Sequence, residues 1–261
     1  MMSQMIAKMG KGQYPSINQD DIVSLLLPLP PLEIQRQIVA ECEAVDKETH
    51  QARVAIKQAR ESIDSALSDI SKENPIKKTL GQICDIQRGR FTHRPRNEPR
   101  FFGGKYPFLQ TGDVVRAKHG KVEFTQTLNE EGLAVSRLFT KPLVLITIAA
   151  NIGDTAVLDY PACFTDSVVG LTPKDGNMDV RYLEFVMRTH KKKLNDEAPQ
   201  MAQKNINIEI LRPLLIPVPL LKDQMRFVKS VEEQEARITA AEGVLAATPA
   251  RKTAILKKHL E

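Results

Sequence analysis

The sequence predicts an α+β protein in which one mixed α/β domain with a β-rich core is flanked by two long helices that form an antiparallel coiled coil. Three observations support this fold class: an internal repeat, a regular apolar stripe along two helical stretches, and strand-like runs between those stretches. With 261 residues, 42% of them hydrophobic, the chain is long enough for one good-sized core and too short for several independent domains.

The repeat has a separation of 189 residues. Ile17-Asn18 and the later segment from Leu25 to Gln35 recur as Ile206-Asn207 and the segment from Leu214 to Gln224, with eight identical residues in one gapless register. A general likeness of proline-rich apolar stretches would explain the shared leucines and prolines, but not the shared Asn and Gln. We expect each copy to form a short buried strand, ended by its prolines and followed by a helix.

Each predicted helix carries a stripe of small or apolar residues at steps that alternate between four and three, which is typical of a coiled-coil seam. The first helix is expected from Glu33 to Ser71, and the second keeps the same register until Pro249 interrupts it. The seam positions are Ile38, Cys42, Val45, Thr49, Ala52, Ile56, Ala59, Ile63, Ala66 and Ile70, then Phe227, Val231, Gln234, Ile238, Ala241, Leu245 and Thr248. An ordinary amphipathic helix packed on its own domain is the alternative for each. Pairing within the chain would be antiparallel, because the intervening domain must return the chain to where it left.

The segment between the helices alternates strand and turn signals. Strand-like runs cover Pro142 to Ile148 and Ala156 to Leu158, a turn is expected at Gly103-Gly104, and a helical stretch lies near Val180 to Asn195. The expected boundaries are residues 1–31 as the C-terminal remnant of a preceding domain, 32–74 as the first helix, 75–220 as the α/β domain and 221–261 as the second helix. Pro75 is the expected helix stop.

Cysteine usage and hydropathy indicate the setting of the protein. The three cysteines, Cys42, Cys84 and Cys163, are odd in number and widely spaced, which favours reduced core or seam residues over a disulfide framework or a zinc site. No apolar run approaches the ~20 residues needed to span a bilayer, so we expect a cytoplasmic protein with no membrane partner.

Basic residues are concentrated in one stretch, residues 88–121, which we call the basic segment. It holds nine basic and two acidic residues, whereas the whole chain has a net charge of +5. Planar guanidinium groups suit phosphate and the guanine edge, so this segment is the candidate nucleic-acid site. The candidate residues are Arg88, Arg90, His93, Arg94, Arg96, Arg100, Lys105, Gln110, Thr111, Arg116, Lys118 and Lys121. The alternative is a solvated loop, or arginines paired with acidic residues elsewhere. The interleaved aromatic residues are expected to be core anchors rather than stacking platforms.

Motifs for catalysis are missing from the sequence. It contains no Asp/Asn-Pro-Pro-Tyr/Phe motif of an adenine methyltransferase, no glycine-rich phosphate loop and no Glu-x-Lys or Asp-x-Lys pair of a metal-dependent nuclease. We therefore expect a non-catalytic protein with no catalytic residues, no metal site and no cofactor of its own.

Three segments resemble the specificity (S) subunits of type I restriction-modification systems. Phe101 to Val114 (FFGGKYPFLQTGDV) looks like the opening of a target-recognition domain, Leu145 to Ala156 resembles its central strand pair, and Ala202 to Gln224 resembles its close and the start of the conserved-region helix. In that family, each of two recognition domains reads one half of a split DNA sequence, and the paired helices hold them apart. Here the first domain is reduced to its last strand and connector.

The resemblance implies sequence-specific binding to double-stranded DNA as a specificity subunit or half-subunit. Its implied partners are an adenine methyltransferase subunit, which would bind S-adenosylmethionine, a restriction subunit, and either a second copy of the chain or a complementing half S subunit. A coiled-coil oligomerisation scaffold with an incidental basic loop, an RNA-binding module and the C-terminal specificity part of a fused methyltransferase are the alternatives.

Overall fold

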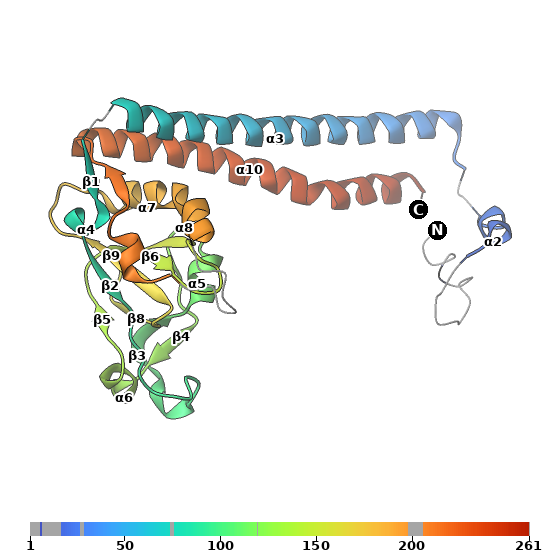
Figure 1. Cartoon of the computed structure of the whole chain (residues 1–261). Coiled ribbons are helices and arrows are strands. Elements are labelled where there is room, and N and C mark those ends of the chain that lie inside the picture. The colour runs from blue at the N-terminus through green and yellow to red at the C-terminus, as the bar shows by residue number, and fades with distance from the viewer. Residues whose placement is uncertain are drawn as a thin grey trace. The chain divides into compact units, whose positions relative to one another are not determined.

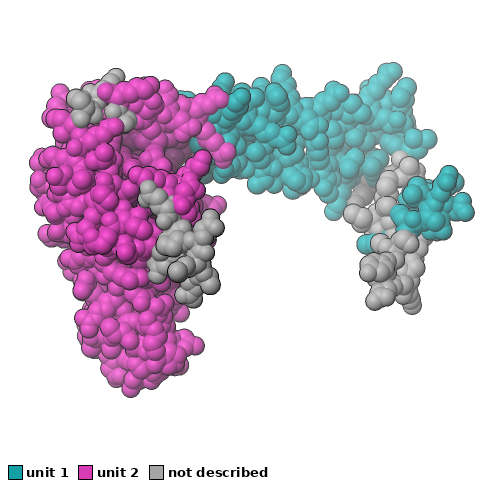
Figure 2. Space-filling view, viewed as in Figure 1, with its two compact units in different colours: residues 1–59, 236–261 teal, residues 60–235 magenta. Residues whose placement is uncertain are grey.

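The computed structural model describes residues 6, 17–26, 29–73, 76–118, 120–197 and 206–260, in two compact units (Figures 1 and 2). Unit 1 consists of residues 1–59 and 236–261, and unit 2 consists of residues 60–235. The α+β fold class is confirmed: unit 2 holds the sheets, and two long helices contribute to both units.

The centre of unit 2 is an antiparallel four-stranded sheet. Leucine, valine and isoleucine fill its strand β6 (Leu143–Thr147), all of whose residues are buried, as expected for a central strand covered on both faces. Both strand-like runs predicted in this region are confirmed. In spatial order the sheet contains β2 (Cys84–Arg88), β9 (Val168–Pro173), β6 and β7 (Thr155–Leu158).

A second four-stranded sheet corrects the prediction for Gly103-Gly104, which lie inside a strand and not in a turn. In the ladder between β3 and β4, Phe102 and Tyr106 both pair with Leu128, so the strand bulges at the glycines. A Cβ on Gly104 would lie 2.3 Å from the Cα of Asn129, so only glycine permits this close approach. This sheet has the order β4 (Gln126–Leu128), β3 (Phe102–Leu109), β8 (Ala162–Phe164) and β5 (Leu138–Phe139), with β3 and β8 parallel.

Short elements and one helical pair complete unit 2. The helical stretch predicted near Val180 to Asn195 is two helices, because the first ends with a C-cap at His190. The remaining elements are β1 (Lys77–Thr79), α4 (Leu80–Ile83), η1 (Pro99–Phe101), α5 (Thr111–Arg116), α6 (Glu130–Ala134), α7 (Val180–Thr189), α8 (Lys191–Glu197), α9 (Ile208–Leu211) and β10 (Leu215–Pro217).

The cysteines match their expected roles. Cys84 and Cys163 are free and buried in unit 2, and Cys42 is free and half-buried in the seam. Burial raises the pKa of the Cys84 thiol to about 12. These thiols are therefore part of the hydrophobic packing.

The two copies of the repeat share their local hydrogen bonds, which explains the matching Asn and Gln. The side chain of Asn18 caps α2 (Gln19–Val23), and that of Asn207 caps α9. The side-chain amide of Gln35 donates to the carbonyl of Pro30 at 2.8 Å, and that of Gln224 donates to Pro219 at 2.9 Å. Polar identities in the repeat therefore mark a helix cap and a bond that fixes the start of the long helix.

The copies differ in burial and in strand formation. Ile22 is 54% exposed, whereas its counterpart Leu211 is fully buried. The predicted strand forms in the second copy, where β10 pairs with β1, but Leu25 and Leu26 lie outside any strand. Residues 27 and 28 are outside the described residues. A strand needs a ladder partner, and among the described residues no counterpart of β1 flanks the first copy.

The long helices are α3 (Leu32–Glu73) and α10 (Leu221–Leu260), seen side by side in Figure 1. In unit 1 their contacts run in opposite directions along the two sequences, so the pair is antiparallel as predicted. These contacts join Glu41 with Lys258 (2.8 Å), Asp46 with Lys252 (2.6 Å), Glu48 with Arg251 (2.5 Å) and Thr49 with Thr248 (3.0 Å). Exposed ion pairs contribute little each, so most of the stabilisation falls to the seam.

Every predicted seam position is buried or half-buried. In unit 1 this applies to Ile38, Cys42, Val45, Thr49, Ala52, Ile56 and Ala59 on α3 and to Ile238, Ala241, Leu245 and Thr248 on α10. In unit 2 the stripe joins the domain core: Ile70, Phe227 and Val231 are members of the cluster that includes the central sheet, and Ile63 and Ala66 pack against it. Gln234 is half-buried.

Pro249 does not interrupt α10, contrary to the prediction, and the helix continues to Leu260. Proline removes one hydrogen bond to the carbonyl four residues earlier, and this loss is tolerated where water can replace the donor. Pro249 is exposed, which meets that condition. The ion pairs formed by Arg251, Lys252 and Lys258 hold the turns beyond it.

A buried ionic network joins α7 to α10 within unit 2. The fully buried carboxylate of Glu184 accepts hydrogen bonds from Arg181 (3.0 Å), from Arg188 (2.6 Å) and from the Thr155 hydroxyl on β7 (2.7 Å). Both arginines also contact Glu235 on α10, at 3.0 and 2.5 Å. The network therefore connects the central sheet, α7 and α10.

We predict that Glu184→Gln lowers the free energy of unfolding by about 3 kcal/mol, because removing one partner of a buried ion pair leaves charge uncompensated. Glu232→Gln is the matched control: this side chain also contacts Arg181 but is 52% exposed, so the expected decrease is below about 0.5 kcal/mol. Denaturant unfolding of both variants measures the difference, and equal decreases would contradict the assigned role of Glu184.

Candidate nucleic-acid interface

The basic segment begins where β2 leaves the central sheet. Gly89 approaches the turn between β8 and β9 so closely that a Cβ would lie 2.2 Å from the carbonyl oxygen of Thr165. Beyond it, the backbone N–H of Arg90 donates to the carbonyl of Phe164 at 2.9 Å. This backbone contact holds the start of the segment against the β8–β9 turn.

Aromatic side chains anchor the segment from beneath, as predicted. Phe91, Phe101 and Phe108 are buried together, with ring centroids of Phe91 at 5.9 Å from Phe101 and 5.1 Å from Phe108. Phe102 and Tyr106 are partly buried and pack against this cluster. Since the three central rings face the interior, they serve as core anchors and cannot stack on bases.

Asp166, in the β8–β9 turn, accepts hydrogen bonds from three of the candidate arginines. Its carboxylate accepts from Arg94 (3.1 Å) and Arg96 (2.5 Å), and its main-chain carbonyl accepts from Arg88. Glu98 gathers two further candidates: it pairs with His93 and, at 2.7 Å, with Arg100. The guanidinium of Arg100 also lies over the ring of Phe101, 4.6 Å from its centroid.

A second group of candidates surrounds the first turn of α5. Gln110 caps this helix together with Asp113, a carboxylate only 3% exposed that also pairs with Arg116. The side-chain amide of Gln110 donates to Gln126 at 2.7 Å, and the half-buried Thr111 is the first residue of α5. Among the described residues, no side-chain hydrogen bond or ion pair joins this group to the arginines around Asp166.

The remaining candidates lie apart from both groups. Lys105 on β3 pairs with Glu130 at 2.9 Å, and the hydrogen bond from Lys105 is the main cause that lowers the pKa of Glu130. Lys121 pairs with Asp159 at 2.5 Å. Arg90 and Lys118 are exposed and have no side-chain partner within the part of the chain that the structure describes.

Six of the nine basic residues thus contact a carboxylate, so the alternative of arginines paired with acidic residues elsewhere applies to much of the segment. The sequence did not reveal this because Asp166, Glu130 and Asp159 lie outside residues 88–121. Apart from the pair of Arg116 with the buried Asp113, these ion pairs are on the surface, where each contributes about 0–1 kcal/mol. A phosphate or a base edge can therefore replace a carboxylate at little cost.

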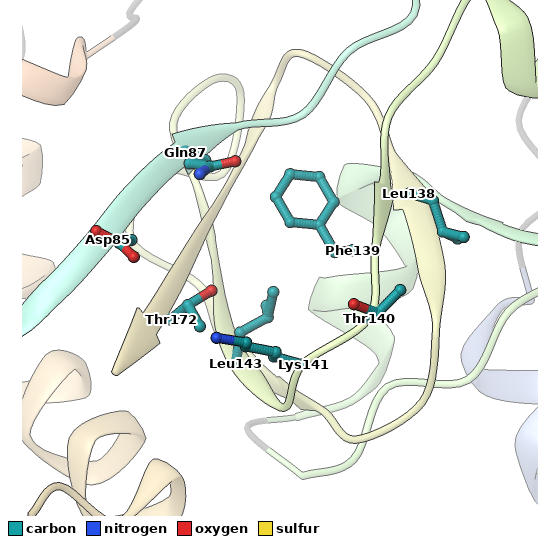
Figure 3. Close-up of a pocket in the computed structure, with 8 residues that line it drawn as sticks. All are labelled: Asp85, Gln87, Leu138, Phe139, Thr140, Lys141, Leu143 and Thr172. Carbon is teal, nitrogen blue, oxygen red and sulfur yellow. The ribbon is translucent and has the colours of Figure 1, made fainter. Parts of the chain in front are cut away.

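A hollow of about 220 Å³ lies beside the basic segment between β2, β5 and β9 (Figure 3). Asp85 and Gln87 enter it from β2, Phe139 from β5, Thr172 from β9, and Lys141 from the loop before β6. Sequence reasoning missed these residues, although the alternation of buried Cys84 and Ile86 with exposed Asp85 and Gln87 was the available signal. The exposed Arg137 donates to Gln87 at 3.3 Å and adds a cation next to the hollow.

Neither a metal centre nor a membrane span is found in the described part of the chain. Within residues 17–26, 29–73, 76–118, 120–197 and 206–260, no group of three His, Cys, Asp or Glu side chains is placed to hold a metal ion. In the same ranges, no helix is long and apolar enough to cross a membrane.

Comparisons with known proteins agree on one family. A family model described as the type I restriction modification DNA specificity domain matches residues 73–245. A Methanocaldococcus jannaschii protein, provisionally named the type I restriction enzyme MjaX specificity subunit, is 24% identical over 245 residues, which are 87% of this chain and 56% of that protein. The chain thus spans little more than half the length of this relative.

Solved structures give the same picture. The HsdS subunit from Thermoanaerobacter tengcongensis matches with a TM-score of 0.61 and 25% identity over 99% of this chain and 66% of that one. A chain from work on assembly and conformational transition of the type I R-M system matches with a TM-score of 0.66 and 23% identity, over 100% and 67%. The S subunit from M. genitalium matches with a TM-score of 0.57 and 14% identity, over 98% and 68%. These last two likenesses concern the fold alone.

The family match covers most of the α/β domain and the part of α10 up to residue 245, and the matched structures extend over both long helices. The chain therefore belongs to the family of type I restriction-modification specificity subunits.

Proposed function

We propose that this chain binds double-stranded DNA sequence-specifically through the basic segment and directs an adenine methyltransferase subunit and a restriction subunit to that site. The observation that carries the proposal is the group of exposed guanidinium groups of Arg94, Arg96 and Arg100, in a segment that the buried Phe91 and Phe101 anchor to the core. Rigid anchoring matters because base readout depends on side chains whose positions are fixed before DNA arrives.

Electrostatics favours DNA as the ligand of this surface. Arg90 and Lys118 are exposed cations without a side-chain partner among the described residues, and Arg96 is bound there only by a weak surface ion pair with Asp166. Contacts with phosphates release condensed counterions, which makes such binding strongly dependent on salt. Arginine can also read guanine through two parallel hydrogen bonds.

A second recognition domain is part of the proposal. The first copy of the repeat has the same cap and glutamine bond as the second, but it exposes apolar side chains that the second copy buries, for example Ile22 in place of Leu211. We propose that residues 17–32 close another recognition domain as residues 206–221 close this one. The proposed partners include a second copy or a complementing half S subunit, and the outward faces of α3 and α10 would dock the methyltransferase.

In this proposal, the methyltransferase and restriction subunits carry out the reactions on DNA. S-adenosylmethionine would bind the methyltransferase subunit, and the chain itself would take no catalytic part. A coiled-coil scaffold is the second candidate function, favoured by the carboxylates that pair with most of the basic segment. DNA binding separates the two candidates.

The basic segment is tested by replacing Arg94, Arg96 and Arg100 together with Ala. We expect selection from a random duplex library to yield one consensus with the parent, and the variant to bind this site at least tenfold more weakly. The slope of log affinity against log salt should fall by about 0.9 for each phosphate that the variant no longer neutralises.

The matched control removes the same charge from α3, as Arg36, Lys47 and Arg53 to Ala, all exposed in the structure. We expect this variant to bind as the parent does. Equal binding by the parent and the basic-segment variant would contradict the site. An absence of duplex binding by the parent would favour the scaffold, and preference for single strands would favour an RNA-binding module.

The purified chain, supplied with S-adenosylmethionine and magnesium, should neither methylate nor cut DNA, because the motifs for both reactions are absent. Incorporation of labelled methyl groups and cleavage of a plasmid that carries the selected site are the two measurements. Methyl transfer by a preparation free of other subunits would refute the non-catalytic assignment.

The helices are tested as a spacer by removing facing heptads, Thr49–Ala55 from α3 and Glu242–Thr248 from α10. This deletion keeps the alternation of four and three on both helices and shortens them by about 10 Å. In an assembly with two recognition domains, the preferred gap between half-sites should shrink by about three base pairs, without a change in either half-site.

The control deletes four residues from each helix, Ala52–Ala55 and Leu245–Thr248, which rotates the stripes away from each other. This variant should lose stability rather than change the gap. Site selection and thermal unfolding measure both variants, and an unchanged gap after the heptad deletion would show that the helices do not set the distance.

A further inference from the structure

The turn between β8 and β9 brings an acidic side chain into the basic segment from a distant part of the sequence. Asp166 lies 70 residues beyond Arg96, and its carboxylate binds both Arg96 and Arg94. The turn itself is fixed by the sheets: Thr165 N–H donates to the carbonyl of Leu109 at 3.1 Å, and Gly89 N–H donates to that of Val168 at 2.9 Å. The backbone around Asp166 is therefore held in place, and its carboxylate can fix the positions of these arginines.

Most of the hydrogen-bond donors of Arg94 bind groups within the protein. Its Nη1 donates to the main-chain carbonyls of Phe91 (2.6 Å) and His93 (2.7 Å), and its Nη2 donates to Asp166. Since a guanidinium has five N–H donors, these bonds occupy three of them and both donors of Nη1. Arg94 therefore acts as a strut that braces the loop.

Arg96 is bound in a different way. Its one bond within the described residues runs from Nη2 to Asp166 Oδ1 at 2.5 Å, and its side chain is 43% exposed. Four donors remain, so one complete edge of the planar fork is available for two parallel hydrogen bonds. The carboxylate fixes the direction in which this edge points.

We propose that Asp166 is a positioning residue for sequence readout, which holds Arg96 for a bidentate contact with a guanine edge in the major groove. The proposal rests on DNA binding by the basic segment and adds the residue that sets selectivity. A guanine edge fits better than a phosphate because its O6 and N7 acceptors are uncharged, whereas a phosphate next to Asp166 would be repelled by the carboxylate.

The experiment compares Asp166→Asn, Arg96→Ala and Arg96→Lys with Arg53→Ala, a control that removes an exposed arginine of α3, outside the basic segment. The consensus duplex selected with the parent and a scrambled duplex of the same length are titrated at several salt concentrations. The measured quantity is the ratio of the two affinities, with the salt slope as a second readout.

Asp166→Asn should reduce this ratio on the order of tenfold, which corresponds to one bidentate base contact. Binding to the scrambled duplex should become tighter, because a negative charge has been removed near the phosphates. Both Arg96 variants should relax selection at one base pair, and Lys should not rescue it because an ammonium lacks the fork. Arg53→Ala should keep the ratio.

Other results would overturn the proposal. A ratio unchanged by Asp166→Asn but reduced by Arg96→Ala would mean that Asp166 does not orient Arg96, and the proposed DNA-binding function would stand. If Arg96→Ala lowers the salt slope by about 0.9 and weakens both duplexes equally, Arg96 contacts a phosphate instead. A parent that binds neither duplex would refute the proposed function together with this inference. Thermal unfolding midpoints equal to that of the parent exclude a folding defect in each variant.

Discussion

The pairing of two three-residue strands sets the conditions for the rest of the molecule. Strands β1 and β10 pair antiparallel, with Lys77 opposite Pro217 and Thr79 opposite Leu215. One strand follows α3 and the other precedes α10, so the chain enters and leaves the α/β domain at the same place. Helix α3 leads into this pair of strands and α10 leads out of it, so the two helices are antiparallel neighbours. The matching stripes of the two helices can then face each other.

Much of this architecture could be predicted from the sequence because it depends on periodicity. The steps of four and three from Ile38 to Ile70 predict a seam that is buried or half-buried at every position, and the apolar run before Ile148 predicts a central strand. The prediction was wrong where the local structure depended on the close approach of another backbone segment or on exposure to solvent. Gly103-Gly104 form a bulge because a neighbouring backbone lies against them, and Pro249 is accommodated because it is exposed.

The candidate site was harder to predict than the fold, because its electrostatics arise from contacts between distant residues. The concentration of arginines in residues 88–121 is visible in the sequence, but their pairing with Asp166 depends on how β8 and β9 pack against the start of the segment. Local counting gives two acidic residues in that stretch, whereas five carboxylates contact its basic side chains. A carboxylate placed among arginines weakens the attraction of this surface for DNA, but it fixes the orientation of the arginine side chains. This arrangement favours selectivity of binding over affinity.

The network around Glu184 also has a mechanical consequence. A pull along α10 would reach the domain through the peptide that leads to β10 and through the core packing of Phe227 and Val231. It would also reach the domain through the side chains that join Glu235 to Arg181 and Arg188 and, by way of Glu184, to β7. The ionic route carries part of the load to β7, the edge strand of the central sheet, and away from the short β1–β10 ladder. Tension on the helix would therefore strain charged hydrogen bonds before it peels the three-residue strands apart.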